Sequence, residues 1–173
     1  MRRLILFRHA KTEVRPPHVD DSDRVLVARG RGDAAAIGRA LARAGLTPDV
    51  ALVSPAARAR ETWELAKPAF AGAHAEFRDG LYNAAQEDVE AELATHDPAA
   101  NTVMIVGHNP SLQELGVSLL IDGGAPPAAI ETLSAGFPTA TAAVFLIDDA
   151  GRASLEAIFH ARDYRDGDAR PPS

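Results

Sequence analysis

The sequence of 173 residues contains no cysteine, which excludes disulfide bridges and thiolate metal sites and is compatible with the cytoplasm, where we expect the protein. Long apolar runs are also missing. No stretch approaches the length of a membrane span, and the first apolar run ends at Arg8 after four residues, which is too short for the core of a signal peptide. Positive charge is not in excess, because 18 Lys and Arg face 24 Asp and Glu, for a net charge of −6. This balance argues against general nucleic-acid binding.

What the sequence does contain is typical of one globular domain. Hydrophobic residues make up 46% and charged residues 24%, and the chain is long enough to bury a core of its own. We find no internal repeat and no linker between two domains. We therefore expect a single domain over residues 1–162, followed by a polar, proline-rich tail over residues 163–173. No heptad pattern indicates the oligomeric state.

Short apolar runs alternate with helical patterns along the chain. This alternation predicts an α/β fold: a single three-layer domain with a mostly parallel central sheet, a C-terminal antiparallel hairpin, and helices on both faces. The expected strands are 3–8, 50–53, 74–78 (an edge strand), 102–107, 141–147 and 153–159. The expected helices are 28–44, one that starts at Pro55 and ends or kinks near Pro68, 86–96, and one from Pro110 to Asp122. Residues 125–138, rich in Pro, Gly and Ala, are expected to form an extended loop.

Chemically active side chains follow three of these strands. Arg8 and His9 follow the first strand, Arg58 follows the strand at 50–53, and His108 follows the strand at 102–107. Because ligands bind beyond the carboxyl ends of parallel strands, we expect these four side chains to meet at one edge of the sheet. Ser54 is expected to be the N-cap, and Pro55 the first residue, of the helix that follows the strand at 50–53. Asn109 and Pro110 are expected to have the same roles in the helix that follows the strand at 102–107.

Two arginines and two histidines at such an edge fit a phosphoryl group. Guanidinium groups match phosphate oxygens two at a time, and helix starts add backbone N–H donors. His9 is then a candidate nucleophile if the attacking nitrogen is neutral and the other donates to a backbone carbonyl. Neighbouring arginines favour this neutral form. His108, expected to be cationic once phosphate is bound, would stabilise charge on the transferring group.

Three motifs carry a resemblance to a known family: Arg8-His9, the segment 54–62 (Ser-Pro-Ala-Ala-Arg-Ala-Arg-Glu-Thr), and the segment 106–110 (Val-Gly-His-Asn-Pro). In this order they resemble the histidine phosphatase superfamily, with the phosphoglycerate mutase-like fold. The short chain is most similar to the bacterial phosphohistidine phosphatases that act on histidine-phosphotransfer proteins. The match runs from residue 3 to about residue 159.

The resemblance implies that His9 becomes phosphorylated, that Arg8, Arg58 and His108 hold the phosphoryl group, and that water hydrolyses the intermediate without a metal or other cofactor. Further candidates for substrate binding are Lys11, Thr12 and Asn109. The first two are equally compatible with lining the loop, and Asn109 is in the first place a helix cap.

The chain departs from the family's pattern in three places. Ala10 stands where the family usually has glycine, and Val27 where a threonine often caps the first helix. Larger members also have a glutamate, the general acid, in the loop after the third strand. Here Glu87 and Asp88 are the nearest carboxylates, and they fit the first turn of a helix better than an acid catalyst. The missing acid favours a phosphohistidine substrate, because imidazole leaves more readily than an alkoxide.

The leading hypothesis is therefore a metal-independent phosphatase acting on protein phosphohistidine. Its partner would be a phosphorylated protein such as a histidine-phosphotransfer domain, or otherwise a small phosphate ester, with no nucleic acid and no membrane involved. The alternatives are a small-molecule phosphomonoesterase of the same fold and a non-catalytic phosphate-binding protein. A metal hydrolase with His9 and His108 as ligands is disfavoured because neighbouring arginines repel a cation. Loops 13–23 and 125–138 are expected to form the rim of the site.

Overall fold

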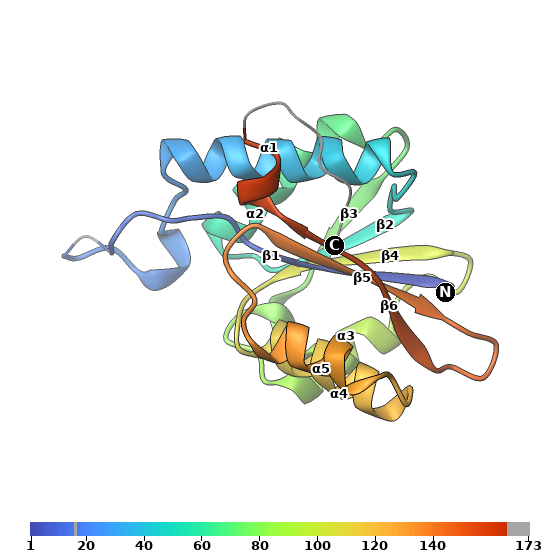
Figure 1. Ribbon diagram of the computed structural model, residues 1–173. Helices are drawn as coiled ribbons and strands as arrows, with labels where there is room; N and C mark the ends of the chain where they lie inside the picture. The colour runs from blue at the N-terminus through green and yellow to red at the C-terminus, as the bar shows by residue number, and fades with distance from the viewer. Residues whose placement is uncertain (16, 166–173) are drawn as a thin grey trace.

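A mixed six-stranded sheet forms the centre of the computed structural model, which describes residues 1–15 and 17–165 (Figure 1). The strand order is β3-β2-β4-β1-β5-β6. Strands β1 to β4 run parallel to one another, whereas β5 pairs antiparallel with both β1 and β6. The strand bounds are β1 Arg3–Arg8, β2 Val50–Val53, β3 His74–Phe77, β4 Thr102–Gly107, β5 Thr141–Ile147 and β6 Ala153–His160.

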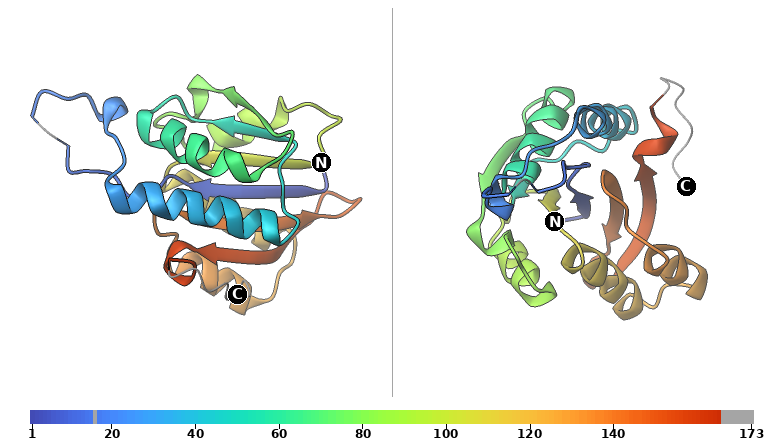
Figure 2. Two further views of the ribbon diagram at one scale, coloured as in Figure 1. Left: turned by 90° about the horizontal axis from the view of Figure 1, so that it is seen from above. Right: turned by 90° about the vertical axis from the view of Figure 1, so that its left-hand side faces the viewer.

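Helices cover both faces of this sheet (Figures 1 and 2). One face carries α1 (Ala28–Arg43) and α2 (Ala57–Ala66). The other carries α3 (Gln86–Ala94), α4 (Ser111–Asp122) and α5 (Pro127–Ser134). The predicted α/β fold, its mostly parallel sheet and its C-terminal hairpin are confirmed. Short 3₁₀ helices connect the elements: η1 Asp21–Asp23, η2 Lys67–Ala69, η3 Asp79–Leu81 and η4 Ala161–Asp163.

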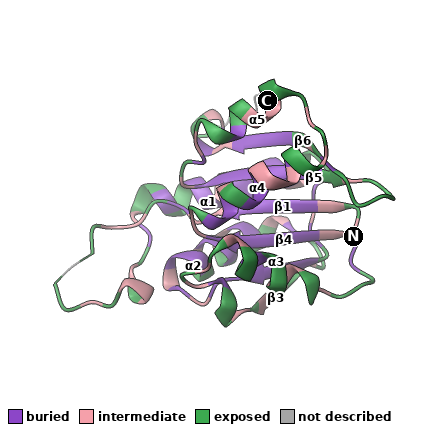
Figure 3. Cartoon of the chain, turned by 90° about the horizontal axis from the view of Figure 1, so that it is seen from below, coloured by how far each residue is buried: buried purple, intermediate pink, exposed green. Residues whose placement is uncertain are grey.

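Strand β1 shows why its sequence is apolar at four consecutive positions. Ile5 and Phe7 join the core under α1 and α2, whereas Leu4 and Leu6 join the core under α3, α4 and α5. Successive side chains of a strand point to opposite faces, so a strand covered on both faces needs apolar residues throughout. Figure 3 shows β1 and β4 buried along most of their length. The chain therefore leaves the core only at the strand ends, where the polar motifs begin.

The predicted helix caps at Ser54 and Asn109 are wrong. Helix α2 begins at Ala57 and α4 at Ser111, and neither helix has a side-chain hydrogen bond at its N-cap. The side chains of Ser54 and Asn109 are engaged elsewhere: Ser54 Oγ lies 2.8 Å from His108 Nε2, and Asn109 Nδ2 donates to the carbonyl of Phe137. Both residues are thus committed to the loops at the strand ends, so the helices start later than predicted.

The prediction of an extended loop over residues 125–138 is also wrong, because residues 127–134 form α5. Pro127 occupies the first turn, where a missing backbone N–H costs nothing. Leu133 is buried against the core beneath α4, and this contact stabilises a helix of only eight residues. The proline and glycine content of the segment therefore marks the two ends of a helix rather than a loop throughout.

The packed part of the chain extends beyond residue 162, where the predicted tail begins. Tyr164 is buried and stacks on Phe159, with ring centroids 5.9 Å apart. Arg165 donates two hydrogen bonds to the buried carboxylate of Asp33, at 2.9 and 3.1 Å. Residues 166–173 of the predicted tail lie outside the described residues. Over the part that is described, no helix is long and apolar enough to cross a membrane.

Gly30 in the first turn of α1 lies against the segment that follows His9. A Cβ atom at this position would be 2.1 Å from the carbonyl oxygen of Lys11, which accepts a hydrogen bond from the N–H of Val27. We expect Gly30→Ala to lower the free energy of unfolding by about 2 kcal/mol, because backbone must move to admit the methyl group. Urea denaturation measures the change.

Gly32 in the same helix is the matched control, because a Cβ atom there meets nothing within 4 Å. Gly32→Ala is expected to raise the free energy of unfolding by up to about 1 kcal/mol, since alanine favours the helix more than glycine does. Equal stability of the two variants would contradict the close approach at Gly30.

Candidate active site

A cavity of about 400 Å³ opens at the carboxyl ends of β1, β2 and β4. The loop between β1 and α1, which contains η1, extends beyond this edge of the sheet (Figure 2). The cavity is lined by His9, Asp21, Arg24, Arg58, Asn83, Ala84, His108, Asn109 and Pro110. The structure thus brings together His9, Arg58 and His108, as the strand-end argument predicts. Arg8 lies beside the cavity rather than in its lining.

His9 is held in a single orientation by the backbone around it. The backbone N–H of His9 donates to the carbonyl of Gly107 at the end of β4. Its ring atom Nδ1 lies 2.8 Å from the carbonyl oxygen of Ala10. A carbonyl oxygen only accepts hydrogen bonds, so Nδ1 carries the proton and Nε2 keeps a free electron pair. The amide of Ala10 in turn donates to the buried hydroxyl of Thr62, which donates to the carbonyl of Arg58. Helix α2 therefore supports the turn that carries His9.

The environment of His9 keeps its imidazole neutral. Burial, together with the positive charges of Arg58, Arg8 and Arg24, lowers the pKa of His9 to about 4 against the opposing hydrogen bond to Ala10. At neutral pH the ring is therefore uncharged, with Nε2 unprotonated. This is the form that a nucleophilic histidine requires.

His108 is neutral for similar reasons. Burial, followed by the charge of Arg58, lowers the pKa of His108 to about 3. Arg58 Nε donates to His108 Nδ1 at 3.2 Å, so the ring proton is on Nε2, which donates to Ser54 Oγ at 2.8 Å. The ring centroids of His9 and His108 are 5.2 Å apart. A phosphoryl dianion beside His108 would raise its pKa, and a cationic His108 in that bound state stays a prediction.

Of the three arginines around the cavity, Arg58 is buried and Arg8 and Arg24 are half-buried, and one side-chain nitrogen of each of the latter two lacks a hydrogen-bond partner among the described residues. Arg58 is 6% exposed, and its Nη1 donates to the carbonyl of Asp21 at 2.6 Å. Arg8 Nη1 donates to the carbonyl of Phe137 at 2.6 Å. Among the described residues, no partner meets the Nε atoms of Arg8 and Arg24, although both atoms are buried. Buried cationic donors of this kind suit an anionic ligand, because a bound anion would compensate their charge.

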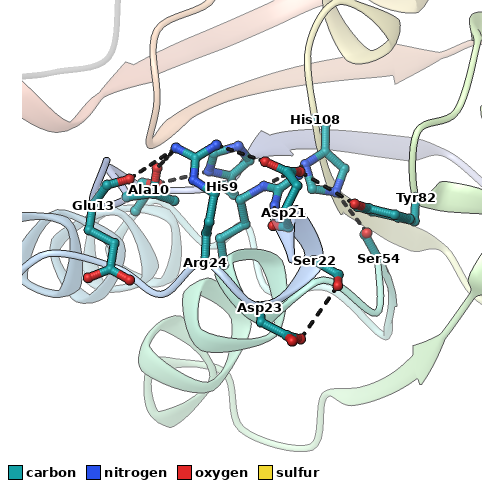
Figure 4. Close-up of polar contacts among 12 residues, drawn as sticks. His9, Ala10, Glu13, Asp21, Ser22, Asp23, Arg24, Ser54, Tyr82 and His108 are labelled. Atoms are coloured by element: carbon teal, nitrogen blue, oxygen red, sulfur yellow. Dashed lines mark hydrogen bonds and ion pairs between the residues drawn. The ribbon is translucent and has the colours of Figure 1, made fainter. Parts of the chain in front are cut away.

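Two residues of the site, Asp21 and Arg24, were not predicted individually from the sequence. Asp21 lies near the end of the loop over residues 13–23, which was expected only as a rim, and Arg24 directly follows that loop. Asp21 binds Arg24 and Arg58 through its two carboxylate oxygens, each at 3.0 Å (Figure 4). Arg24 Nη2 also donates to Thr12 Oγ1 at 2.6 Å. The spacing of Asp21 and Arg24, three residues apart in a polar loop, was the available signal, and it is a weak one.

The remaining candidates lie as follows. Lys11 is exposed and outside the cavity lining, and Thr12 is engaged with Arg24, so both belong to the loop. Asn109 lines the cavity and donates to Gln113 and to the carbonyl of Phe137. Glu87 and Asp88 are exposed on the first turn of α3, and Asp88 accepts a hydrogen bond from the N–H of Ala85. Their interpretation as helix-start residues agrees with these contacts.

The N-terminus of α1 lacks the capping threonine that the family often has, and other hydrogen bonds are made there instead. Val27 is the N-cap and has no side-chain hydrogen bond. Instead, Glu61 on α2 accepts a hydrogen bond from the N–H of Leu26 at 2.9 Å, and the N–H of Val27 donates to Lys11. A carboxylate from a neighbouring helix therefore meets a backbone donor at this end of α1.

The two depressed histidine pKa values predict a loss of stability in acid. A histidine whose pKa is lower in the folded state binds a proton more readily when unfolded, so the free energy of unfolding falls as pH drops from 6.5 towards the folded values of about 4 for His9 and about 3 for His108. The expected cost over this window is about 3 kcal/mol for His9 and about 5 kcal/mol for His108. Urea unfolding at a series of pH values measures the slope.

His108→Asn is expected to make that slope shallower by up to one proton. His18→Asn is the control, because His18 is exposed and lies outside the cavity lining. A slope that is the same in wild type and in His108→Asn would argue that burial does not hold His108 neutral.

No metal site accompanies the cavity: in residues 1–15 and 17–165, no three His, Asp or Glu side chains form a group that could hold a metal ion.

Comparison with known proteins agrees with this geometry. Residues 4–92 match the family model described as histidine phosphatase superfamily (branch 1). The uncharacterized protein Rv1276c of Mycobacterium tuberculosis is 36% identical over 142 residues, which cover 82% of this chain and 87% of that protein. Among solved structures, SixA from Agrobacterium tumefaciens, a provisionally assigned phosphohistidine phosphatase, is 32% identical with a TM-score of 0.80, covering 92% of this chain and 97% of that one. The protein histidine phosphatase SixA complexed with tungstate shares the fold, with a TM-score of 0.76 at 22% identity, over 93% of this chain and 98% of that one.

Proposed function

Because this chain belongs to the histidine phosphatase superfamily, we propose that it is a metal-independent phosphatase whose nucleophile is His9. The observation that carries the proposal is the state of His9. Its Nδ1–H is bound to the carbonyl of Ala10, its ring is neutral, and it lines a cavity that also contains Arg58 and Arg24. An oriented neutral imidazole among cationic donors is equipped to attack a phosphoryl group.

In the first chemical step, His9 Nε2 attacks phosphorus. A P–Nε2 bond forms, the bond from phosphorus to the leaving group breaks, and its electron pair leaves with that group. The hydrogen bond from Nδ1–H to Ala10 stabilises the positive charge that the ring acquires. Arg58 lies in the cavity and Arg8 beside it, so both would compensate the charge of the phosphoryl oxygens.

In the second step, a water molecule attacks the phosphohistidine. A P–O bond forms and the P–Nε2 bond breaks, which returns its electron pair to Nε2. Because Nδ1 keeps its proton throughout, His9 leaves as a neutral imidazole and returns to the state seen in the structure.

We propose protein phosphohistidine as the substrate class. The cavity lining contains no carboxylate except Asp21, and the pKa of Asp21 is lowered, chiefly by its hydrogen bond with Arg24. An ionised carboxylate has no proton to give to a leaving alkoxide, so it cannot act as the general acid for a phosphate ester. A phosphohistidine whose second ring nitrogen carries a proton releases neutral imidazole and needs no general acid. The similarity to SixA supports the same class. A phosphorylated histidine-phosphotransfer domain would then meet two segments, the loop over residues 13–23 and the segment 125–138 that contains α5.

The experiment is to measure phosphate release from a chemically phosphorylated histidine-phosphotransfer domain and from p-nitrophenyl phosphate, both with EDTA present. Fast release from the protein and slow release from the ester is the expected result. Release from the ester alone would instead indicate a small-molecule phosphomonoesterase. Phosphate binding without any hydrolysis would indicate a binding protein, and loss of activity in EDTA would contradict the metal-independent mechanism.

A further inference from the structure

The carboxylate of Asp21 lines the cavity together with His9 and His108, and the steps above give it no role. Asp21 opens η1 in the loop between β1 and α1. Its Oδ1 accepts from Arg24 Nη1 at 3.0 Å, and its Oδ2 pairs with Arg58 Nη2 at 3.0 Å and accepts from the hydroxyl of Tyr82 at 3.4 Å (Figure 4). Its position is therefore fixed by cationic and hydroxyl groups from three parts of the chain.

Asp21 and a bound phosphoryl group would share one guanidinium. Arg58 pairs with Asp21 through Nη2 and with His108 through Nε, so it connects the carboxylate directly to the candidate phosphate site. An anion that replaced or joined these contacts would lie next to the Asp21 carboxylate. The side chain of Asp21 remains 36% exposed, whereas that of Arg58 is 7% exposed. Asp21 is thus accessible to water, whereas Arg58 is not.

The chemistry of the second step calls for a group at that place. In-line attack on a phosphohistidine requires water opposite the P–Nε2 bond, on the side from which the first leaving group departed. The backbone N–H and Nδ1 of His9 are bonded to Gly107 and Ala10, so Nε2 is the ring nitrogen left for the cavity, which Asp21 also lines. The attacking water must also lose a proton, and a carboxylate that is ionised before the reaction is able to accept it.

We propose that Asp21 is the base that accepts the proton of the attacking water during hydrolysis of the His9 phosphohistidine. The water oxygen forms its bond to phosphorus, its proton passes to an Asp21 carboxylate oxygen, and the P–Nε2 bond breaks with its electron pair returning to His9. Inorganic phosphate and a protonated Asp21 result, and Asp21 then releases the proton to solvent. This inference rests on the proposed phosphatase activity.

The groups that face Asp21 set the pH at which it can act. They are Arg24 in its own loop, Arg58 on α2, Tyr82 after η3, and His108 after β4. The two arginines keep the pKa of Asp21 below its ordinary value, so it is ionised at neutral pH. The hydrolysis step is therefore expected to slow in acid as Asp21 becomes protonated.

The test separates the two chemical steps by rapid quench into alkali, in which phosphohistidine is stable, with a histidine-phosphotransfer domain carrying radiolabelled phosphate as substrate. In Asp21→Asn, label is expected to reach His9 at a rate within a few-fold of wild type, whereas its hydrolysis slows about a hundredfold. Phosphoenzyme then accumulates in the variant, and the acid limb of the hydrolysis rate disappears. Asp21→Glu, which keeps a carboxylate, is expected to recover part of the hydrolysis rate.

Asp149→Asn is the control, because Asp149 lies in the turn between β5 and β6, is exposed, and lies outside both the cavity lining and the segments proposed to meet the substrate. It is expected to leave both steps at wild-type rates. Wild-type hydrolysis in Asp21→Asn would overturn the proposal. So would an equal slowing of both steps, which indicates that Asp21 only positions Arg58, or faster turnover with tighter phosphate binding, which indicates that Asp21 only competes with phosphate. A wild-type protein that forms no phosphoenzyme and releases no phosphate would instead refute the proposed function itself.

Discussion

His9→Asn is expected to lower the rate of phosphate release from phosphohistidine by about 10⁵-fold, since removal of a nucleophile that forms a covalent intermediate eliminates the catalysed route. Asparagine retains a donor that can reach the carbonyl of Ala10, which accepts from His9 Nδ1 at 2.8 Å. It has no group able to form a bond to phosphorus from the position of Nε2. The turn after β1 is therefore preserved while the chemistry is lost.

Two measurements check this result. Steady-state phosphate release gives the loss of rate, and gels of alkali-quenched samples show the acid-labile phosphoenzyme in wild type and none in His9→Asn. His160→Asn is the control, because His160 contacts Thr141 and lies outside this cavity. Substantial residual turnover in His9→Asn, or label that persists on the variant, would mean that another residue is the nucleophile.

Arg58→Ala is expected to lower kcat/KM by about a thousandfold, through loss of charge stabilisation in the transition state. The same guanidinium makes three contacts: Nε with His108, Nη1 with the carbonyl of Asp21, and Nη2 with the carboxylate of Asp21. Arg58→Lys keeps the positive charge but offers one compact ammonium instead of a planar fork. We expect it to recover only a small part of the activity.

The electrostatic role of Arg58 has its own readout. Its positive charge contributes to the lowered pKa of both His9 and His108, so Arg58→Ala is expected to raise both pKa values, as followed by NMR titration of the rings. Inhibition by vanadate should weaken in parallel. Arg60→Ala is the control two residues along the same helix, where the exposed guanidinium lies over the ring of Phe77. Unchanged histidine pKa values in Arg58→Ala would show that burial alone keeps the rings neutral.

These predictions share one physical basis, which is the low dielectric of the cavity. Burial is the largest cause of the lowered pKa of both histidines, and it also strengthens every contact that Arg58 makes. The same burial that prepares His9 for attack costs stability in acid. The pH dependence of the free energy of unfolding and the kinetics of phosphate release therefore both depend on the protonation of His9 and His108.

The sequence by itself determined the sheet and the edge of the sheet at which the four predicted site residues lie. Apolar runs at 4–7 and 103–106 predict strands covered on both faces, and parallel strands end at a common edge. Local sequence is sufficient here because the side-chain period of a strand and the direction of parallel strands leave little choice. His9, Arg58 and His108 consequently line one cavity, with Arg8 at its border.

The tertiary structure alone decided which partners those residues have. Nothing local to Ser54 or Asn109 shows that each side chain contacts the site rather than a helix N-terminus. Asp21 becomes part of the site only because its loop folds back over α2 and brings its carboxylate to Arg58, 37 residues further along the chain. The histidine pKa values depend on burial by elements from the whole chain. Contacts between distant loops follow from packing, which no periodicity in the sequence encodes.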